Sequence, residues 1–121
     1  MTNYKNLEVW KKSMLLVKEI YLLTKKYPKE ELYALTSQTK RAAVSIPSNI
    51  TEGCGRNYKK DTIQFLHISR GSIYELETLL NIAVMVDFIS ENDYSPFTLR
   101  IDECIKIING LISYYEKSNL K

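Results

Sequence analysis

The chain contains 121 residues, of which 45% are hydrophobic and 26% are charged, as in an ordinary globular protein. We expect one folded domain covering residues 1–121, because there is enough apolar surface to offset the entropy of folding. The chain has only 4 glycines and 3 prolines. So few turn-forming residues argue against a turn-rich all-β architecture and favour long helices.

The composition predicts a cytoplasmic protein with no membrane contact. The first fourteen residues have no continuous apolar core of the kind that a signal peptide needs. The longest unbroken apolar run, residues 82–86, is far shorter than the roughly 20 residues of a spanning helix. Cys54 and Cys104 lack the spacing of a metal site or a redox motif, so we expect two reduced thiols.

The charge of the chain is unevenly distributed. The formal net charge is only +3, yet residues 1–60 carry 12 basic and 5 acidic side chains, whereas residues 61–121 carry 5 and 9. Such asymmetry has two interpretations. It is typical of proteins that contact a polyanion or an oppositely charged partner, and it also arises when a helical protein simply places its charges on solvated faces.

The first of four segments with helical periodicity covers residues 7–26. Two neighbouring apolar rows follow it, one through Trp10 and Met14 and the other through Leu16 and Ile20. Two rows make a face wide enough to contact two other helices. Lysines repeat at intervals of seven on the opposite face, at positions Lys11, Lys18 and Lys25.

The second helix is predicted over residues 28–52. Pro28 suits a first helical position, where its missing N–H is not needed, and Gly53 is the expected stop. Pro47 removes the hydrogen bond to the Ala43 carbonyl and is expected to kink the helix. The predicted core row of this helix is Leu32, Thr36, Thr39, Ala43, Ile46 and Ile50.

The third and fourth helices are predicted over residues 59–86 and 96–117. Ser90 with Asp93 is one start signal for the last helix, but Pro96 after Ser95 is judged the stronger. All connections are short, and short connections make consecutive helices antiparallel neighbours. The fold class is therefore all-α, an antiparallel up-down-up-down four-helix bundle with a Pro-kinked second helix.

Catalytic and metal-binding patterns are not evident in the sequence. A di-iron bundle needs two Glu-x-x-His units, and the single histidine, His67, has Gln64 at the partner position. A nucleophile activated by histidine has only this residue available, and Cys54 lies far from it along the helix. No phosphate-binding glycine motif occurs. We expect no enzyme activity, no metal and no cofactor.

A polar ridge accompanies the core row of the second helix. On an antiparallel hairpin that turns near residue 56, Arg41 lies opposite Ser72 to Glu75, which predicts an Arg41–Glu75 ion pair. The ridge is interpreted either as a solvated polar face or as a polar network within the hairpin or between subunits. Its members are Gln38, Arg41, Ser45, Ser48, Asn49 and Glu52, with Glu75 across the hairpin.

The run Gln38–Gly53, QTKRAAVSIPSNITEG, resembles the signature of the four-helix-bundle proteins encoded in ribosomal-RNA intervening sequences, the 23S rRNA intervening sequence proteins. Residues 7–10 (LEVW), 27–31 (YPKEE) and 70–77 (RGSIYELE) fit the same family. The family is similar to the accessory variability determinant of diversity-generating retroelements, a basic pentameric barrel that engages a reverse transcriptase and nucleic acid. The chain departs from the pattern at Cys54 and at Pro96.

The resemblance implies an all-α protomer, a homopentamer and a non-catalytic nucleic-acid role. The implied partners are further copies of the chain, RNA or DNA, and a nucleic-acid-processing protein. An assembly module that binds only proteins is the alternative. The candidate nucleic-acid contacts are Lys40, Arg56, Lys59 and Lys60, with Lys11, Lys18 and Lys25 as a second patch.

Overall fold

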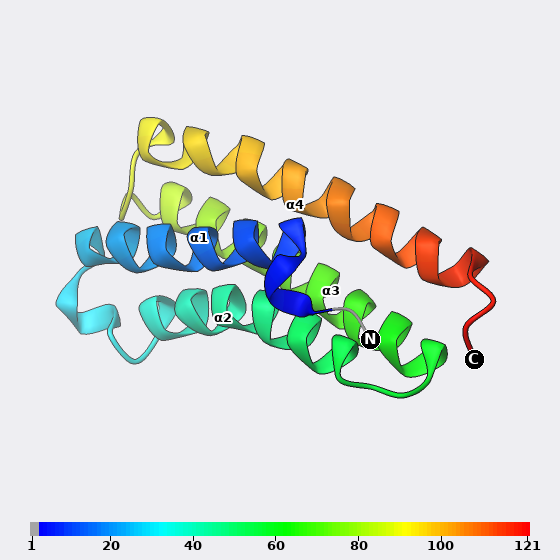
Figure 1. The fold of residues 1–121 in the computed structure, drawn as a ribbon. Coiled ribbons are helices and arrows are strands. Elements are labelled where there is room, and N and C mark those ends of the chain that lie inside the picture. Colours follow the sequence, from blue (N-terminus) through cyan, green and yellow to red (C-terminus); the bar gives the residue numbers. More distant parts are fainter. Residues whose placement is uncertain (1–2) are drawn as a thin grey trace.

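The helical periodicity of the sequence is realised as four antiparallel α-helices in the computed structural model, which describes residues 3–121 (Figure 1). The helices are α1 (Glu8–Leu23), α2 (Leu35–Cys54), α3 (Lys59–Met85) and α4 (Glu91–Lys117). Three short 3-10 turns, η1 (Tyr4–Asn6), η2 (Thr24–Lys26) and η3 (Lys29–Glu31), complete the secondary structure, and no strand occurs within residues 3–121. The predicted all-α four-helix bundle is confirmed.

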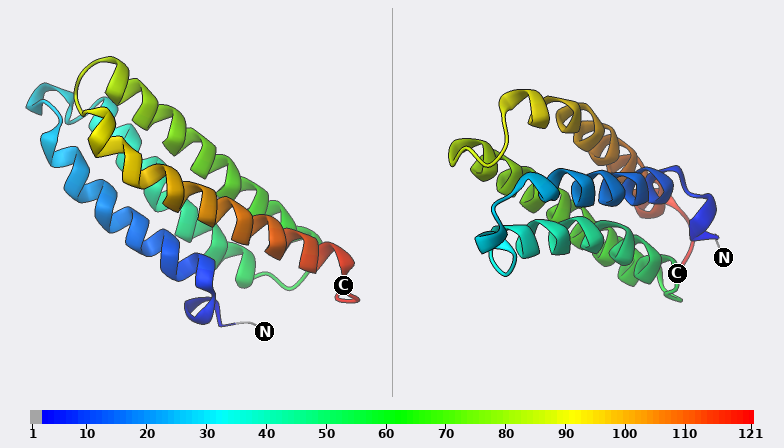
Figure 2. Two further views of the ribbon diagram at one scale, coloured as in Figure 1. Left: turned by 90° about the horizontal axis from the view of Figure 1, so that it is seen from above. Right: turned by 90° about the vertical axis from the view of Figure 1, so that its left-hand side faces the viewer.

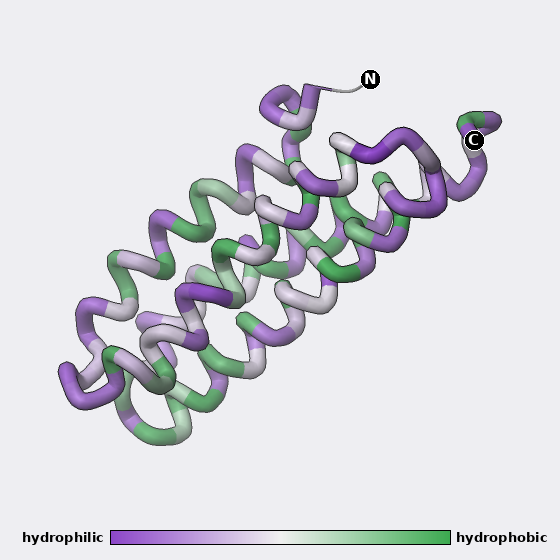
Figure 3. Tube along the Cα trace, turned by 90° about the horizontal axis from the view of Figure 1, so that it is seen from below, coloured by the Kyte–Doolittle hydropathy of each residue, from purple (hydrophilic) through white to green (hydrophobic). Residues whose placement is uncertain are grey.

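Each helix packs on the two neighbours expected of an up-down-up-down bundle. α2 lies beside α1 and α3, and α4 lies beside α3 and α1, whereas the backbones of the diagonal pairs stay apart in the described part of the chain. Figure 2 shows the same arrangement from two further sides. Hydrophobic and hydrophilic residues alternate turn by turn along the helices (Figure 3). No helix in this part of the chain has the length and apolar character to span a bilayer.

The two apolar rows predicted for α1 are buried to different extents. Leu16 and Ile20 are fully buried. Met14 and Tyr21, from the other row, are 44% and 43% exposed. Trp10 and Val17, also from that row, are partly buried and pack against the core. The second row is therefore only partly covered in the isolated protomer.

α2 begins at Leu35, not at Pro28 as predicted. Pro28 has an extended backbone, with φ −57° and ψ 143°, and Leu32 is 50% exposed, so it lies outside the core row. The Glu31 carboxylate accepts a hydrogen bond from the Leu35 backbone N–H at 3.3 Å, which supplies a partner to a donor that the helix start leaves free. At the other end, α2 continues through Gly53 to Cys54. Pro47 lies buried inside α2, and the kink there stays a prediction.

α4 begins at Glu91, and the prediction of a start at Pro96 was wrong. The Ser90 hydroxyl accepts from the Asp93 N–H, and the Asp93 carboxylate accepts from the Ser90 N–H, both at 3.0 Å. This capping box satisfies two backbone donors at once and outweighs the one bond that Pro96 removes. Asp93 also accepts a hydrogen bond from Lys26 at 2.7 Å. That bond, followed by the one from Ser90, lowers the pKa of Asp93 to about 2.

The α2–α3 interface brings two helix backbones close together. Ser69 donates to the Ile46 carbonyl at 2.8 Å, and Thr62 donates to the Gly53 carbonyl at the same distance. A Cβ added at Gly53 would lie 3.1 Å from Phe65 Cβ and 3.2 Å from the Thr62 carbonyl oxygen. The absence of a side chain at residue 53 therefore permits the contact.

Candidate nucleic-acid interface

Six of the seven predicted basic residues lie in two groups, one near the α1–α2 connection and one near the α2–α3 turn, which are at opposite ends of the bundle (Figure 1). Lys18, Lys25 and Lys40 lie at the end where α1 connects to α2. Arg56, Lys59 and Lys60 follow the end of α2, where the chain turns into α3. Lys11 is exposed on the first half of α1 and lines none of the hollows described below. The structure therefore brings together three of the seven predicted contacts at the α1–α2 end.

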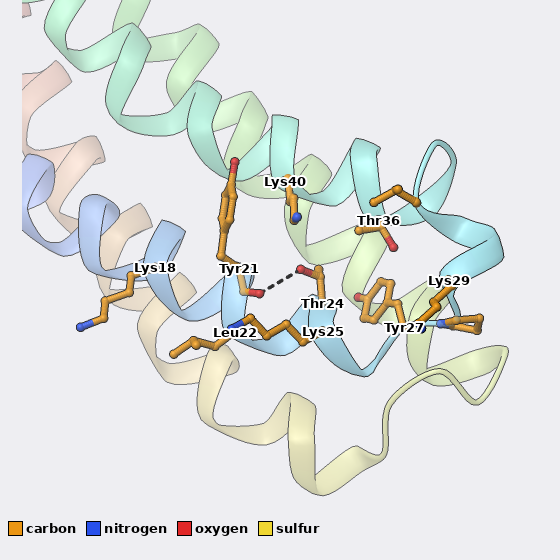
Figure 4. A pocket seen from close by; sticks show the side chains of 11 residues that line it. Lys18, Tyr21, Leu22, Thr24, Lys25, Tyr27, Lys29, Thr36 and Lys40 are labelled. Atoms are coloured by element: carbon orange, nitrogen blue, oxygen red, sulfur yellow. Dashed lines mark hydrogen bonds between the residues drawn. The ribbon is translucent and has the colours of Figure 1, made fainter.

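A hollow of about 480 Å³ lies at this end, here called the α1–α2 hollow. Four lysines line it, and no aspartate or glutamate does. Figure 4 shows Lys40 directed towards the Tyr21 ring and Lys18 extending outwards from α1. The remaining lining is aromatic or apolar for the most part, so the hollow combines positive charge with a surface that can contact a planar ring. The four lysines are Lys18, Lys25, Lys29 and Lys40.

Local contacts fix the walls of the α1–α2 hollow. The Lys40 ammonium lies 4.6 Å from the centroid of the Tyr21 ring, a distance at which the negative face of the ring attracts the cation. Thr24 donates to the Tyr21 carbonyl at 3.2 Å, which ties η2 to the last turn of α1. The buried Tyr27 ring packs against Phe88, with the ring centroids 5.7 Å apart. These contacts give the connection between two helices a defined shape.

The charges of the α1–α2 hollow are not neutralised within the described part of the protomer. The ion pairs of residues 3–121 involve the basic groups of Lys12, Lys26, Arg56 and Arg100, none of which lines the hollow. Lys26 lies next to Lys25 in sequence but pairs with Asp93 on α4. Four ammonium groups without paired carboxylates create a local positive potential that favours an anionic ligand.

The basic residues at the α2–α3 turn are more fully engaged. Arg56 pairs with Glu52 at 3.2 Å and lies over the Phe65 ring, 4.7 Å from its centroid. Lys59 donates its side-chain proton to the Ser118 carbonyl at 3.1 Å. Lys60 is exposed. Of the three predicted contacts, two therefore already have partners within the protomer, which weakens their attraction for an external phosphate.

The polar ridge of α2 forms part of the predicted network. The Ser45 and Ser72 hydroxyls are 2.8 Å apart across the hairpin, and the Asn49 amide donates to the Ser45 carbonyl and hydroxyl. Arg41 and Glu75 line one hollow of about 330 Å³ together with Gln38 and Ser45. No ion pair joins Arg41 to Glu75 among the described residues, and both side chains are exposed, so the predicted pair is wrong for the protomer.

Solvent explains the absence of the Arg41–Glu75 pair. Two long charged side chains that remain hydrated gain little by holding one geometry, because the Coulomb attraction is screened and their rotamer freedom is lost. Glu52, also predicted for this ridge, instead pairs with Arg56 one turn further along the chain. The hydroxyl and amide groups carry the network because they are shorter and partly buried.

The cysteines and the histidine offer little for catalysis. Burial raises the pKa of Cys104 to about 11 and also raises the pKa of Cys54. Both thiols are free and buried, and a protonated, inaccessible thiol is a poor nucleophile. His67 is exposed and its Nδ1 lies 2.8 Å from an Arg70 nitrogen. Among residues 3–121, no group of three His, Cys, Asp or Glu side chains is placed to hold a metal ion.

Sequence reasoning missed Lys29 and the two tyrosines of the α1–α2 hollow. The expected helix from residue 28 would have placed Lys29 on its first turn, whereas the chain crosses there in an extended segment and a 3-10 turn. The lysine spacing on the first helix indicated Lys18 and Lys25, but nothing in that spacing linked them to Lys40. These lysines come together only because the segment between α1 and α2 places the start of α2 beside the end of α1.

Comparisons with known proteins agree with the architecture. The family model described as 23S rRNA-intervening sequence protein matches residues 5–110. A crystal structure from Bacteroides thetaiotaomicron, of a protein with unknown function from the S23 ribosomal protein family, is similar with a TM-score of 0.78. The two chains are 24% identical, and the match covers 86% of this chain and 97% of that chain. No curated protein matches the chain. The structural likeness shows the fold.

The exposure of Arg41 and Glu75 makes a prediction about their energetic coupling. Because both side chains remain hydrated, we expect Arg41→Ala and Glu75→Ala each to change the free energy of unfolding by well under about 1 kcal/mol. The double variant should show the sum of the two effects. Urea unfolding of the three variants measures this. A coupling above about 1 kcal/mol would show that the two residues form a bridge in solution.

Proposed function

The chain belongs to the 23S rRNA-intervening sequence protein family, and we propose that it is a non-catalytic, oligomeric adaptor of the cytoplasm that binds nucleic acid. The observation that carries this proposal is the α1–α2 hollow, which is lined by four lysines and by no carboxylate. The affinity comes from neutralising phosphates and releasing their counterions. Lysine contacts to phosphate fix position but do not read bases, so binding to both RNA and DNA is expected.

The second basic group contributes less to this function. Arg56 and Lys59 would have to give up contacts with Glu52 and with the Ser118 carbonyl to bind phosphate directly. Lys60 and the 64% exposed ring of Tyr58 are free of that cost. We therefore assign the main contact to Lys18, Lys25 and Lys40, and a supporting role to the α2–α3 turn.

Self-association is proposed on a different surface. Trp10, Met14 and Val17 of α1 face Val44 and Pro47 of α2 across an open hollow of about 330 Å³. Met14 and Val44 are 44% and 39% exposed. This patch contains Met14 and the exposed edges of Trp10 and Val17, and burying it between subunits would remove apolar area from water. The family resemblance implies five copies.

A pure assembly module remains the second candidate function. The observation in its favour is the same apolar patch, together with the exposed Arg41 and Glu75 beside it on α2 and α3. In that case the lysines keep the end of the bundle hydrated, and a protein partner binds the apolar patch. Nucleic-acid binding separates the two candidates directly.

The oligomer is tested by light scattering at micromolar concentration. We expect a mass close to five times the protomer's 14.1 kDa. Met14→Glu with Val44→Glu should give monomers, because each places a charge in the buried patch. Leu99→Glu is the matched control, since Leu99 is 74% exposed on α4 and lines no part of the patch. A wild-type monomer would contradict the proposal.

Nucleic-acid binding is tested by titrating single-stranded RNA and DNA at several salt concentrations. The affinity should fall steeply with salt, and the Lys18→Gln/Lys25→Gln/Lys40→Gln variant should lower the salt slope by about 2, at ~0.7 per lost phosphate contact on a single strand.

The Arg56→Gln/Lys59→Gln/Lys60→Gln variant removes the same charge from the other end of the bundle and should have the smaller effect. Undetectable wild-type binding at low salt would transfer the assignment to the assembly module. Equal effects of the two triple variants would show that net charge, and not the α1–α2 hollow, governs binding.

A further inference from the structure

We propose that the α1–α2 hollow binds a single nucleotide unit that carries a terminal phosphate monoester, either the phosphorylated end of a strand or a free mononucleotide. This deepens the proposed nucleic-acid function and rests on it. The hollow would then select an end of a strand, which a basic surface alone cannot do.

The size and shape of the α1–α2 hollow suit a small ligand. The volume of about 480 Å³ lies within the range of small-ligand sites, roughly 300–1,000 Å³. The connection between α1 and α2, with Pro28 and Lys29, forms one wall of the hollow (Figure 4). A strand that enters from the open side therefore meets the chain itself at that wall. The site suits one terminal nucleotide better than the middle of a continuous strand.

The positive charge of the α1–α2 hollow favours a ligand group with more than one negative charge. A phosphodiester inside a strand carries one negative charge, whereas a phosphate monoester carries about −1.5 to −2 at pH 7. Four lysines from α1, the connection and α2 line one hollow. Glu30 and Glu31 follow Lys29 in sequence, yet neither lines the hollow, and Glu31 is engaged at the start of α2. Such a cluster favours the more highly charged group.

The remaining side chains that line the α1–α2 hollow suit a nucleobase. Tyr21 is 43% exposed and has the Lys40 ammonium over its ring at 4.6 Å. Leu22 and Leu32 are 54% and 50% exposed where they line the hollow. A nucleobase gains from stacking on an aromatic ring and from contact with apolar side chains. Phosphate alone would need the lysines only, so the tyrosine and the leucines favour a ligand that also has a base.

The test compares one fluorescent single-stranded RNA with a 5′-phosphate, the same RNA with a 5′-hydroxyl, and their 3′-phosphorylated counterparts, by anisotropy with full-length protein. We expect at least one phosphorylated end to bind about fivefold or more tightly than the hydroxyl end. Uridine monophosphate should compete at lower concentration than inorganic phosphate. Competition by the mononucleotide at concentrations well below those of the strand would identify the free nucleotide as the preferred source.

Two pairs of variants locate the site. Lys40→Gln should abolish most of the preference for the phosphorylated end, whereas Lys106→Gln removes one exposed α4 charge outside the hollow and should retain it. Tyr21→Leu should weaken binding of the mononucleotide about tenfold, as expected for the loss of one stacked base. Tyr74→Leu is its control, because Tyr74 is 47% exposed on α3.

The outcomes separate this inference from the proposed function. If all strand ends bind equally, nucleic-acid binding stands and end recognition is overturned. If no strand binds at low salt, both are overturned. Inorganic phosphate that competes as well as uridine monophosphate, or a Tyr21→Leu variant with unchanged affinity, would remove the nucleotide and leave a simple phosphate site.

Discussion

The close approach of α2 to α3 is the constraint on which the rest of the structure depends. Hydroxyl groups of α3 reach carbonyl oxygens of α2 at two levels, through Ser69 and Thr62. Both contacts require the two backbones to be near each other, and Gly53 makes room at the turn. α2 also contacts α1 on its other side, so the same helix takes part in the α2–α3 contact and in the α1–α2 hollow.

The signature run of residues 38–53 acquires a structural interpretation from this arrangement. Ala43, Ile46 and Ile50 are fully buried, and Ser45 and Asn49 form hydrogen bonds within the hairpin. Small and hydroxylated side chains suit a close contact between helices because they occupy little volume between the two backbones. The resemblance at this run is therefore informative about the fold. The side chains that favour a ligand line the α1–α2 hollow, and Lys40 is the one among them that belongs to the run.

Helical periodicity predicted the four helices and their order, because an amphipathic pattern that continues over 16 or more residues fits few structures other than a helix. The predicted starts of α2 and α4, which were both placed at prolines, were wrong. Pro28 and Pro96 each suit a first helical position, but side-chain caps from Glu31 and Ser90 decided where the helices begin. The spacing of the sequence predicted that Arg41 lies near Glu75, but it could not show that both side chains are exposed to solvent. It also could not reveal Lys29, whose place depends on a non-helical connection.

The most direct test of the α2–α3 constraint is a pair of glycine substitutions measured by urea unfolding. Gly53→Ala places a Cβ at 3.1–3.2 Å from Phe65 and Thr62, whereas a Cβ at Gly71 meets nothing within 4 Å. Gly71→Ala should stabilise the protein by about 0.5–1 kcal/mol, the usual gain of alanine over glycine inside a helix. Gly53→Ala should destabilise it by roughly 1–2 kcal/mol, since the contact with backbone atoms cannot relax cheaply. Equal stabilisation by both substitutions would contradict the account, because it would show that the two helices do not need the close approach.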